Sequence, residues 1–107
     1  MPTDRGRLEE TIFQAIDQVN QLLLPEQRLT KSPDTALTGN ETTLDSLGLV
    51  NLIVAVERNI EENFGVGVVL VSEESMSLPE SPFRKVSALA DYAKILIEKK
   101  LNGRSGS

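Results

Sequence analysis

Two stretches in the first two thirds of this sequence place apolar residues at intervals of three and four, which is the spacing of a helix with one buried face. The first stretch predicts a helix over about residues 5–24, ended by Pro25, because the residue before a proline leaves helical geometry. The second predicts a helix that begins between residues 43 and 46 and ends at Gly65. The two apolar faces consist of Leu8, Ile12, Ile16, Val19 and Leu23, and of Leu49, Ile53, Val56, Ile60 and Phe64.

The rest of the chain predicts one more long helix and irregular connections. A third helical face predicts a helix capped by Ser87 that ends beside residues 102–103. Residues 25–43 have no sustained period and predict a long loop. Residues 66–71 look like a strand that has no partner, so we expect an extended connector, followed by a short helix capped by Ser72. The expected fold class is all-α: a small four-helix bundle with three long helices, one short helix and a long loop between the first and second helices. The third face consists of Val86, Leu89, Ala93, Leu96, Ile97 and Leu101.

The composition limits which chemistry the chain can perform. Its 107 residues fit one domain over about residues 1–102, with 103–107 as a flexible tail or cloning scar. With 0 Cys and 0 His there is no disulfide, thiolate metal site, cysteine nucleophile or imidazole base, so we expect no catalytic residue, no metal site and no enzyme activity.

The uncharged residues 46–56 are fewer than the roughly 18–20 needed to cross a bilayer, and residues 1–6 form no signal peptide. We therefore expect a cytoplasmic protein without membrane insertion.

Acidic side chains are concentrated in the middle of the chain. The formal net charge is -5, and residues 41–80 hold one basic and eight acidic side chains, whereas residues 81–107 hold six basic and two acidic ones. An acidic surface repels nucleic acid and anionic lipid, and it attracts a basic protein partner. A solvated face that is simply charged explains the same run.

The second helix is too apolar for a helix with one buried face. Leu47, Val50 and Val54 form a second stripe along it. Either the helix is central and buries both stripes, or the second stripe is an exposed docking surface rimmed by acidic residues. The residues of that rim are Asp45, Glu57 and Glu61.

Ser46 lies where the second helix is expected to begin. Free backbone N–H groups and the positive end of the helix dipole favour a phosphate at such a position. Serines at helix starts more often only cap the helix, so this position alone leaves both roles open.

The motif Asp45-Ser46-Leu47 occurs at the start of an aliphatic helix after a long loop, and it is followed by Phe64-Gly65 and by the run FRKVSALADY over residues 83–92. In this layout the chain resembles an acyl carrier protein over about residues 8–101. The resemblance implies a four-helix bundle with a long first loop. It also implies a covalent 4′-phosphopantetheine arm, derived from coenzyme A, on Ser46.

The resemblance further implies partners and binding surfaces. A phosphopantetheinyl transferase that uses magnesium would attach the arm, and acyl-transfer, ligase or synthase enzymes would dock on the second helix of a monomeric carrier. Catalysis would then belong to those enzymes. The docking residues implied in this way are Asp45, Leu47, Val50, Asn51, Val54 and Glu57, and the residues lining an acyl-chain cavity are Leu49, Ile53 and Val56.

The chain also departs from the family pattern. Gly48, Asn51 and Arg58 occupy positions where carriers of general fatty acid synthesis commonly have acidic residues, and residues 78–82 look inserted. These departures predict a specialised carrier in lipid or secondary-metabolite biosynthesis, with an aminoacyl or peptidyl carrier as one alternative. Another alternative is an unmodified, carrier-like helical adaptor or structural subunit that uses the same apolar stripe for a permanent partner.

Overall fold

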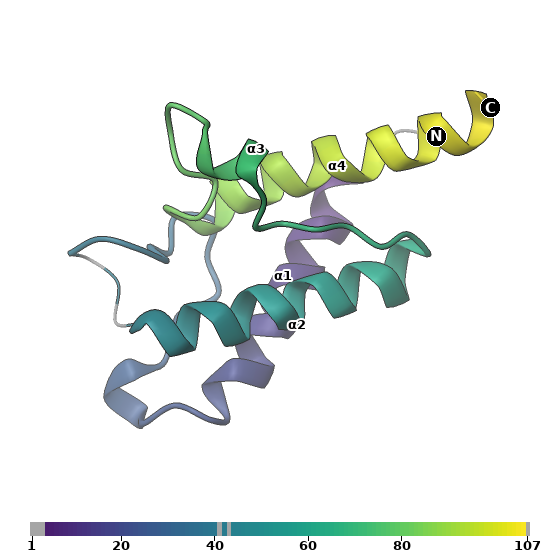
Figure 1. The fold of residues 1–107 in the computed structure, drawn as a ribbon. Helices are drawn as coiled ribbons and strands as arrows, with labels where there is room; N and C mark the ends of the chain where they lie inside the picture. Colours follow the sequence, from purple (N-terminus) through teal and green to yellow (C-terminus); the bar gives the residue numbers. More distant parts are fainter. Residues whose placement is uncertain (1–3, 41, 43, 107) are drawn as a thin grey trace.

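A computed structural model describes residues 4–40, 42 and 44–106 of the chain. Within these residues it contains four α-helices and no strand, with a long loop between α1 and α2, as the sequence predicts (Figure 1). The loop includes one 3₁₀ turn, η1. None of the helices in the described part is long and apolar enough to cross a membrane. The elements are α1 Arg5–Asn20, η1 Pro25–Gln27, α2 Ser46–Phe64, α3 Glu73–Met76 and α4 Val86–Gly106.

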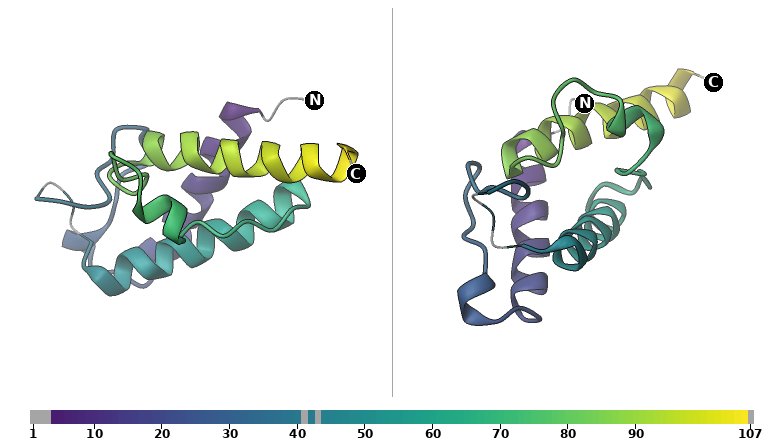
Figure 2. Two further views of the ribbon diagram at one scale, coloured as in Figure 1. Left: turned by 45° about the horizontal axis from the view of Figure 1, so that its top comes forward. Right: turned by 60° about the vertical axis from the view of Figure 1, so that its left-hand side comes forward.

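Helix α1 packs against both α2 and α4, and it lies across the two (Figures 1 and 2). The aliphatic core fills the space between the three long helices, where side chains from all of them are buried. Residues 66–71 form the expected extended connector: Val66, Val68 and Leu70 are buried, whereas Val69 and Val71 are exposed. The largest core side chains include Leu8, Ile12 and Ile16 of α1, Leu52, Val56 and Ile60 of α2, and Val86, Leu89 and Ile97 of α4.

Helix α1 ends at Asn20, so the predicted end at residue 24 is wrong. The Asn20 side chain binds the long loop instead of solvent: its Nδ2 donates to the Leu29 carbonyl and its Oδ1 accepts from the Leu29 N–H, both at 2.9 Å. After Asn20 the chain tightens, since the Leu22 N–H donates to the Val19 carbonyl at 2.8 Å. The helix therefore stops before Pro25 because the loop folds back onto its last turn.

Both ends of α4 differ from the prediction. Ser87 lies inside the first turn and is not the cap. The N–H groups of Val86 and Ser87 donate to the carbonyls of Thr35 and Pro33 at 3.1 and 2.8 Å, so the long loop caps this helix. At the other end, the helical backbone continues to Gly106, past the end expected near residue 102, since one glycine costs a helix only about 1 kcal/mol. The separate assignment of residues 103–107 as a tail stays a prediction.

The buried face of α2 agrees with the predicted one only in part. Ile53, Val56 and Ile60 are buried as predicted, whereas Leu49 and Phe64 are half-buried. The face also includes Leu52 and Asn59, which the pattern omitted. Buried Asn59 donates through Nδ2 to the Thr11 carbonyl at 3.4 Å, which ties α2 to α1. A polar residue does not contribute to an apolar pattern, so this side of the face gave no signal in the sequence.

Candidate functional site at the start of α2

Ser46 is the first residue of α2 and is exposed. Asp45 precedes it in extended backbone conformation and caps the helix, with Oδ1 accepting from the Gly48 N–H at 2.7 Å. The predicted start between residues 43 and 46 is therefore confirmed. Asp45 turns its carboxylate toward the first turn, which fixes the backbone on both sides of Ser46.

The amino end of α2 leaves donors free around Ser46. The backbone N–H groups of Ser46 and Leu47 have no acceptor among the described residues, and the Ser46 Oγ forms no hydrogen bond with them either. These groups lie at the positive end of the helix dipole. A phosphate bonded to the Ser46 Oγ would find donors and a favourable field at this position.

Gly48 allows the chain before α2 to cover the first turn closely. A Cβ atom at this buried position would lie 3.0 Å from Leu44 Cδ2 and 3.2 Å from Asp45 Oδ1. The space left by the missing side chain is thus occupied by Leu44 and by the capping carboxylate.

The second apolar stripe of α2 lies on the surface. Leu47, Val50 and Val54 are 69%, 54% and 47% exposed, so the interpretation in which α2 buries both stripes is wrong. Arg58 continues the line, because spacings of seven and four from Leu47 return to the same side of a helix. We call the exposed residues Leu47, Val50, Val54 and Arg58 the α2 stripe.

Four of the six predicted docking residues, Leu47, Val50, Asn51 and Val54, lie on this exposed side of α2. Asp45 is exposed just before the helix, where it serves as the cap. Glu57 is half-buried, and its Oε2 accepts from the Leu70 N–H at 2.8 Å. This carboxylate holds the connector after α2, which is a structural task.

The three predicted cavity residues pack into the core. Leu49 is half-buried, Ile53 is 7% exposed and Val56 is fully buried. None of them lines either of the two surface hollows next to α2 and α4. Their role in holding an acyl chain stays a prediction.

One hollow of about 330 Å³ lies between α1 and α2, and we call it the α1–α2 groove. The residues that line it are Gln18, Val19, Leu22, Asn51, Val54, Ala55 and Arg58. It adjoins the α2 stripe through Val54 and Arg58. Leu22 and Arg58 were not among the residues predicted to bind a partner, although the spacing of Leu47, Val54 and Arg58 places the arginine on the stripe.

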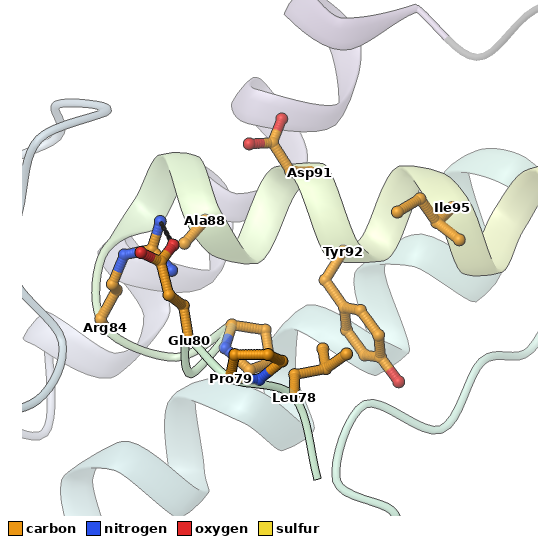
Figure 3. A pocket seen from close by; sticks show the side chains of 9 residues that line it. Leu78, Pro79, Glu80, Arg84, Ala88, Asp91, Tyr92 and Ile95 are labelled. Atoms are coloured by element: carbon orange, nitrogen blue, oxygen red, sulfur yellow. Dashed lines mark ion pairs between the residues drawn. The ribbon is translucent and has the colours of Figure 1, made fainter. Parts of the chain in front are cut away.

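A second hollow of about 390 Å³ lies on α4 (Figure 3). The segment that looks inserted in the sequence forms one wall, with Leu78 beside the Tyr92 ring. Arg84 Nη2 and Glu80 Oε2 form an ion pair of 3.2 Å at its edge. Tyr92 is 6% exposed, and its buried Oη has no hydrogen-bond partner among the described residues.

The described side chains contain no group of three or more potential metal ligands. Ser46 and the α2 stripe therefore form the candidate site: two N–H donors without an acceptor among the described residues, and an exposed apolar surface beside them.

No family model, curated protein or solved structure matches this chain.

Proposed function

We propose that this chain is a carrier protein that bears 4′-phosphopantetheine on Ser46 and delivers acyl groups to partner enzymes. The observation that carries the proposal is the exposed Ser46 hydroxyl at the amino end of α2, next to two backbone N–H groups that have no acceptor among the described residues. When attached, the arm supplies a terminal thiol that holds an acyl group as a thioester. The chain itself has 0 Cys, so this thiol would be the nucleophile that its own side chains lack.

In the attachment reaction the chain would supply only the nucleophile, and the transferase would supply the catalytic groups. The Ser46 oxygen would form a bond to the β-phosphorus of coenzyme A as the bond to 3′,5′-ADP breaks, and a base of the transferase would take the hydroxyl proton. Ser46 contributes an accessible hydroxyl, and the Asp45 cap holds the backbone beside it. The free N–H groups and the helix dipole would stabilise the phosphodiester charge after transfer.

The α2 stripe supports the second half of the proposal, which is delivery. Leu47 is next to Ser46, so an enzyme that covers the exposed stripe also covers the attachment point. Tethering a substrate to a docked carrier raises its effective concentration at the active site of that enzyme. Asn51 and Arg58 on this surface favour partners other than those of a uniformly acidic helix, as in a specialised pathway for lipids, secondary metabolites or aminoacyl groups.

Intact-protein mass spectrometry tests the modification directly. The chain is incubated with coenzyme A, magnesium and a permissive phosphopantetheinyl transferase, alongside the Ser46→Ala variant. Ser87→Ala is the matched control, since Ser87 also lies in the first turn of a long helix. We expect the wild type and Ser87→Ala to gain the mass of one phosphopantetheinyl group and Ser46→Ala to gain none.

A folded wild-type chain that gains no mass with several transferases would contradict the proposal. The exposed α2 stripe would then favour the unmodified adaptor. In that case Ser46→Ala would leave partner binding intact, whereas polar substitutions at Leu47 or Val50 would weaken it.

A further inference from the structure

We propose that the α1–α2 groove receives an apolar anchor residue of a partner protein, while a carboxylate of the same partner binds Arg58. This inference rests on the proposed function, because the partner is one of the enzymes that would dock on the α2 stripe. It adds the chemistry by which the surface recognises that partner: an apolar side chain with an acidic residue beside it.

The lining of the groove suits an apolar side chain. Leu22 and Val54 are 75% and 47% exposed at its edges, and Val19 is buried at 3% exposure. Two elements supply these walls, since α1 and the turn after it face α2 across the groove. An apolar anchor placed there would remove both exposed edge residues from water, which is the usual source of energy at the centre of an interface.

Arg58 is the one charged side chain among the described residues that line the groove. It is exposed and forms no ion pair or hydrogen bond within the described part of the chain, although Glu61 and Glu62 follow three and four positions later. Its other neighbours in the groove are neutral, including the amides of Gln18 and Asn51. The guanidinium is therefore available to a carboxylate, which it can bind through two parallel hydrogen bonds.

Arg58 is too far from Ser46 to contact a phosphate attached there. It lies twelve positions after Ser46, which corresponds to about 18 Å along α2. An interface of ordinary size buries about 800 Å² on each partner, enough to extend from Ser46 along the α2 stripe to Arg58. An enzyme that docks on the stripe would thus meet Arg58 at the far end.

Arg58 then makes the affinity for a partner depend on the charge of the partner residue next to the apolar anchor. A lysine or arginine there would lie against Arg58 and repel it, whereas a glutamate or aspartate would pair with it. The chain as a whole is acidic, with a formal net charge of -5, and it steers basic proteins at long range. If the net charge dominates, a basic partner binds more tightly. If pairing with Arg58 dominates, a partner with an acidic residue next to its anchor binds more tightly.

The test uses two synthetic helical peptides of equal length with one central leucine. One peptide carries glutamates one turn from the leucine, and the other carries lysines there. Each is titrated into the ¹⁵N-labelled chain while the side-chain signals of Asn51 and Arg58 are followed. We expect the acidic peptide to bind at least tenfold more tightly, and we expect Arg58→Glu to invert the preference.

Two further variants complete the design. Val54→Asp should abolish binding of both peptides because it places a charge in the apolar wall of the groove. Lys100→Glu, which makes the same change of charge at an exposed site on α4, should leave the preference unchanged. Tighter binding of the basic peptide, equal binding, or shifts on another face would overturn the inference. Self-association of the chain through Leu22 and Val54, seen by sedimentation, would also overturn it.

The outcome does not depend on the arm. All titrations are repeated with Ser46→Ala, which cannot be modified. An inverted preference in Arg58→Glu together with no mass gain at Ser46 would support the groove and contradict the carrier. Mass gain at Ser46 with no preference between the peptides would support the carrier and overturn the groove.

Discussion

Gly65 ends α2 with a φ of 72°, in the left-handed region, and its N–H donates to the Glu61 carbonyl at 3.0 Å. A side chain at this φ is strained whatever space surrounds it, so Gly65→Ala should lower the free energy of unfolding by about 1 kcal/mol. Gly67→Ala is the matched control, because that residue has no positive φ and its Cβ would meet only Glu61 Oε2, at 3.8 Å.

Urea denaturation followed by circular dichroism measures both variants. Equal stability of Gly65→Ala and Gly67→Ala would contradict the assignment of Gly65 as a left-handed cap. The sequence predicted this residue correctly because a glycine after a helical face is a local signal.

The residues of the candidate site were not equally predictable from the sequence. The locations of Ser46 and Leu47 could be predicted from the residues around them, because helix position and face follow from spacing within about a dozen residues. Leu22 and Arg58 could not be joined in this way, because the groove exists only where the end of α1 meets α2. Glu57 looked like a surface carboxylate, and only the fold shows that it accepts from Leu70.

At the level of the element, the buried and exposed faces of α2 can be compared with one type of substitution. Leu52 is fully buried and Leu47 is 69% exposed, so replacing each leucine by alanine should change the stability of the fold by different amounts. Leu52→Ala should lower the free energy of unfolding by about 2–5 kcal/mol through lost burial and a cavity. Leu47→Ala should change it by less than about 0.5 kcal/mol.

Chemical denaturation of the two variants checks this prediction. Similar losses from both would mean that α2 is rotated relative to its neighbours. The sequence pattern left Leu52 out of the predicted core face and left the burial of Leu47 open, so the two variants test which side of α2 faces the core.

The helices themselves were predictable and several of their ends were not. Apolar periodicity identified all three long helices, and Ser72 correctly marked the start of α3. The end of α1 and the start of α4 depend on hydrogen bonds to the long loop, namely Asn20 to Leu29 and Ser87 to Pro33. Such bonds leave no periodic signal, so local capping rules gave the wrong boundaries.

At the level of the whole molecule, the long loop is part of the folded structure. Leu37 is 1% exposed, and its N–H donates to the Arg84 carbonyl at 3.0 Å, next to the bond from Val86 to Thr35. The amides of Leu37 and Val86 should therefore exchange hydrogen slowly and at similar rates, as one cooperative unit with α4. Gly39 is exposed and its amide donates to no described residue, so it should exchange fast.

Native-state hydrogen exchange followed by nuclear magnetic resonance gives these rates one amide at a time. Exchange at Leu37 as fast as at Gly39 would mean that the loop opens independently of the helices. A loop that opens only with α4 would instead stay anchored to that helix during the proposed modification of Ser46.

The burial of Tyr92 has a practical consequence for every measurement on this protein. The chain contains 1 Tyr and 0 Trp, so its tyrosine fluorescence comes from a single ring, which is 6% exposed on α4 beside Leu78 (Figure 3). The unlabelled protein thus carries its own optical probe of how α4 is packed, and the probe lies on a different helix from the residues that would contact an enzyme. If a substitution on α2 leaves this emission unchanged, the surroundings of Tyr92 on α4 are unchanged as well. The same sample then shows both that docking is lost and that the packing around Tyr92 is retained.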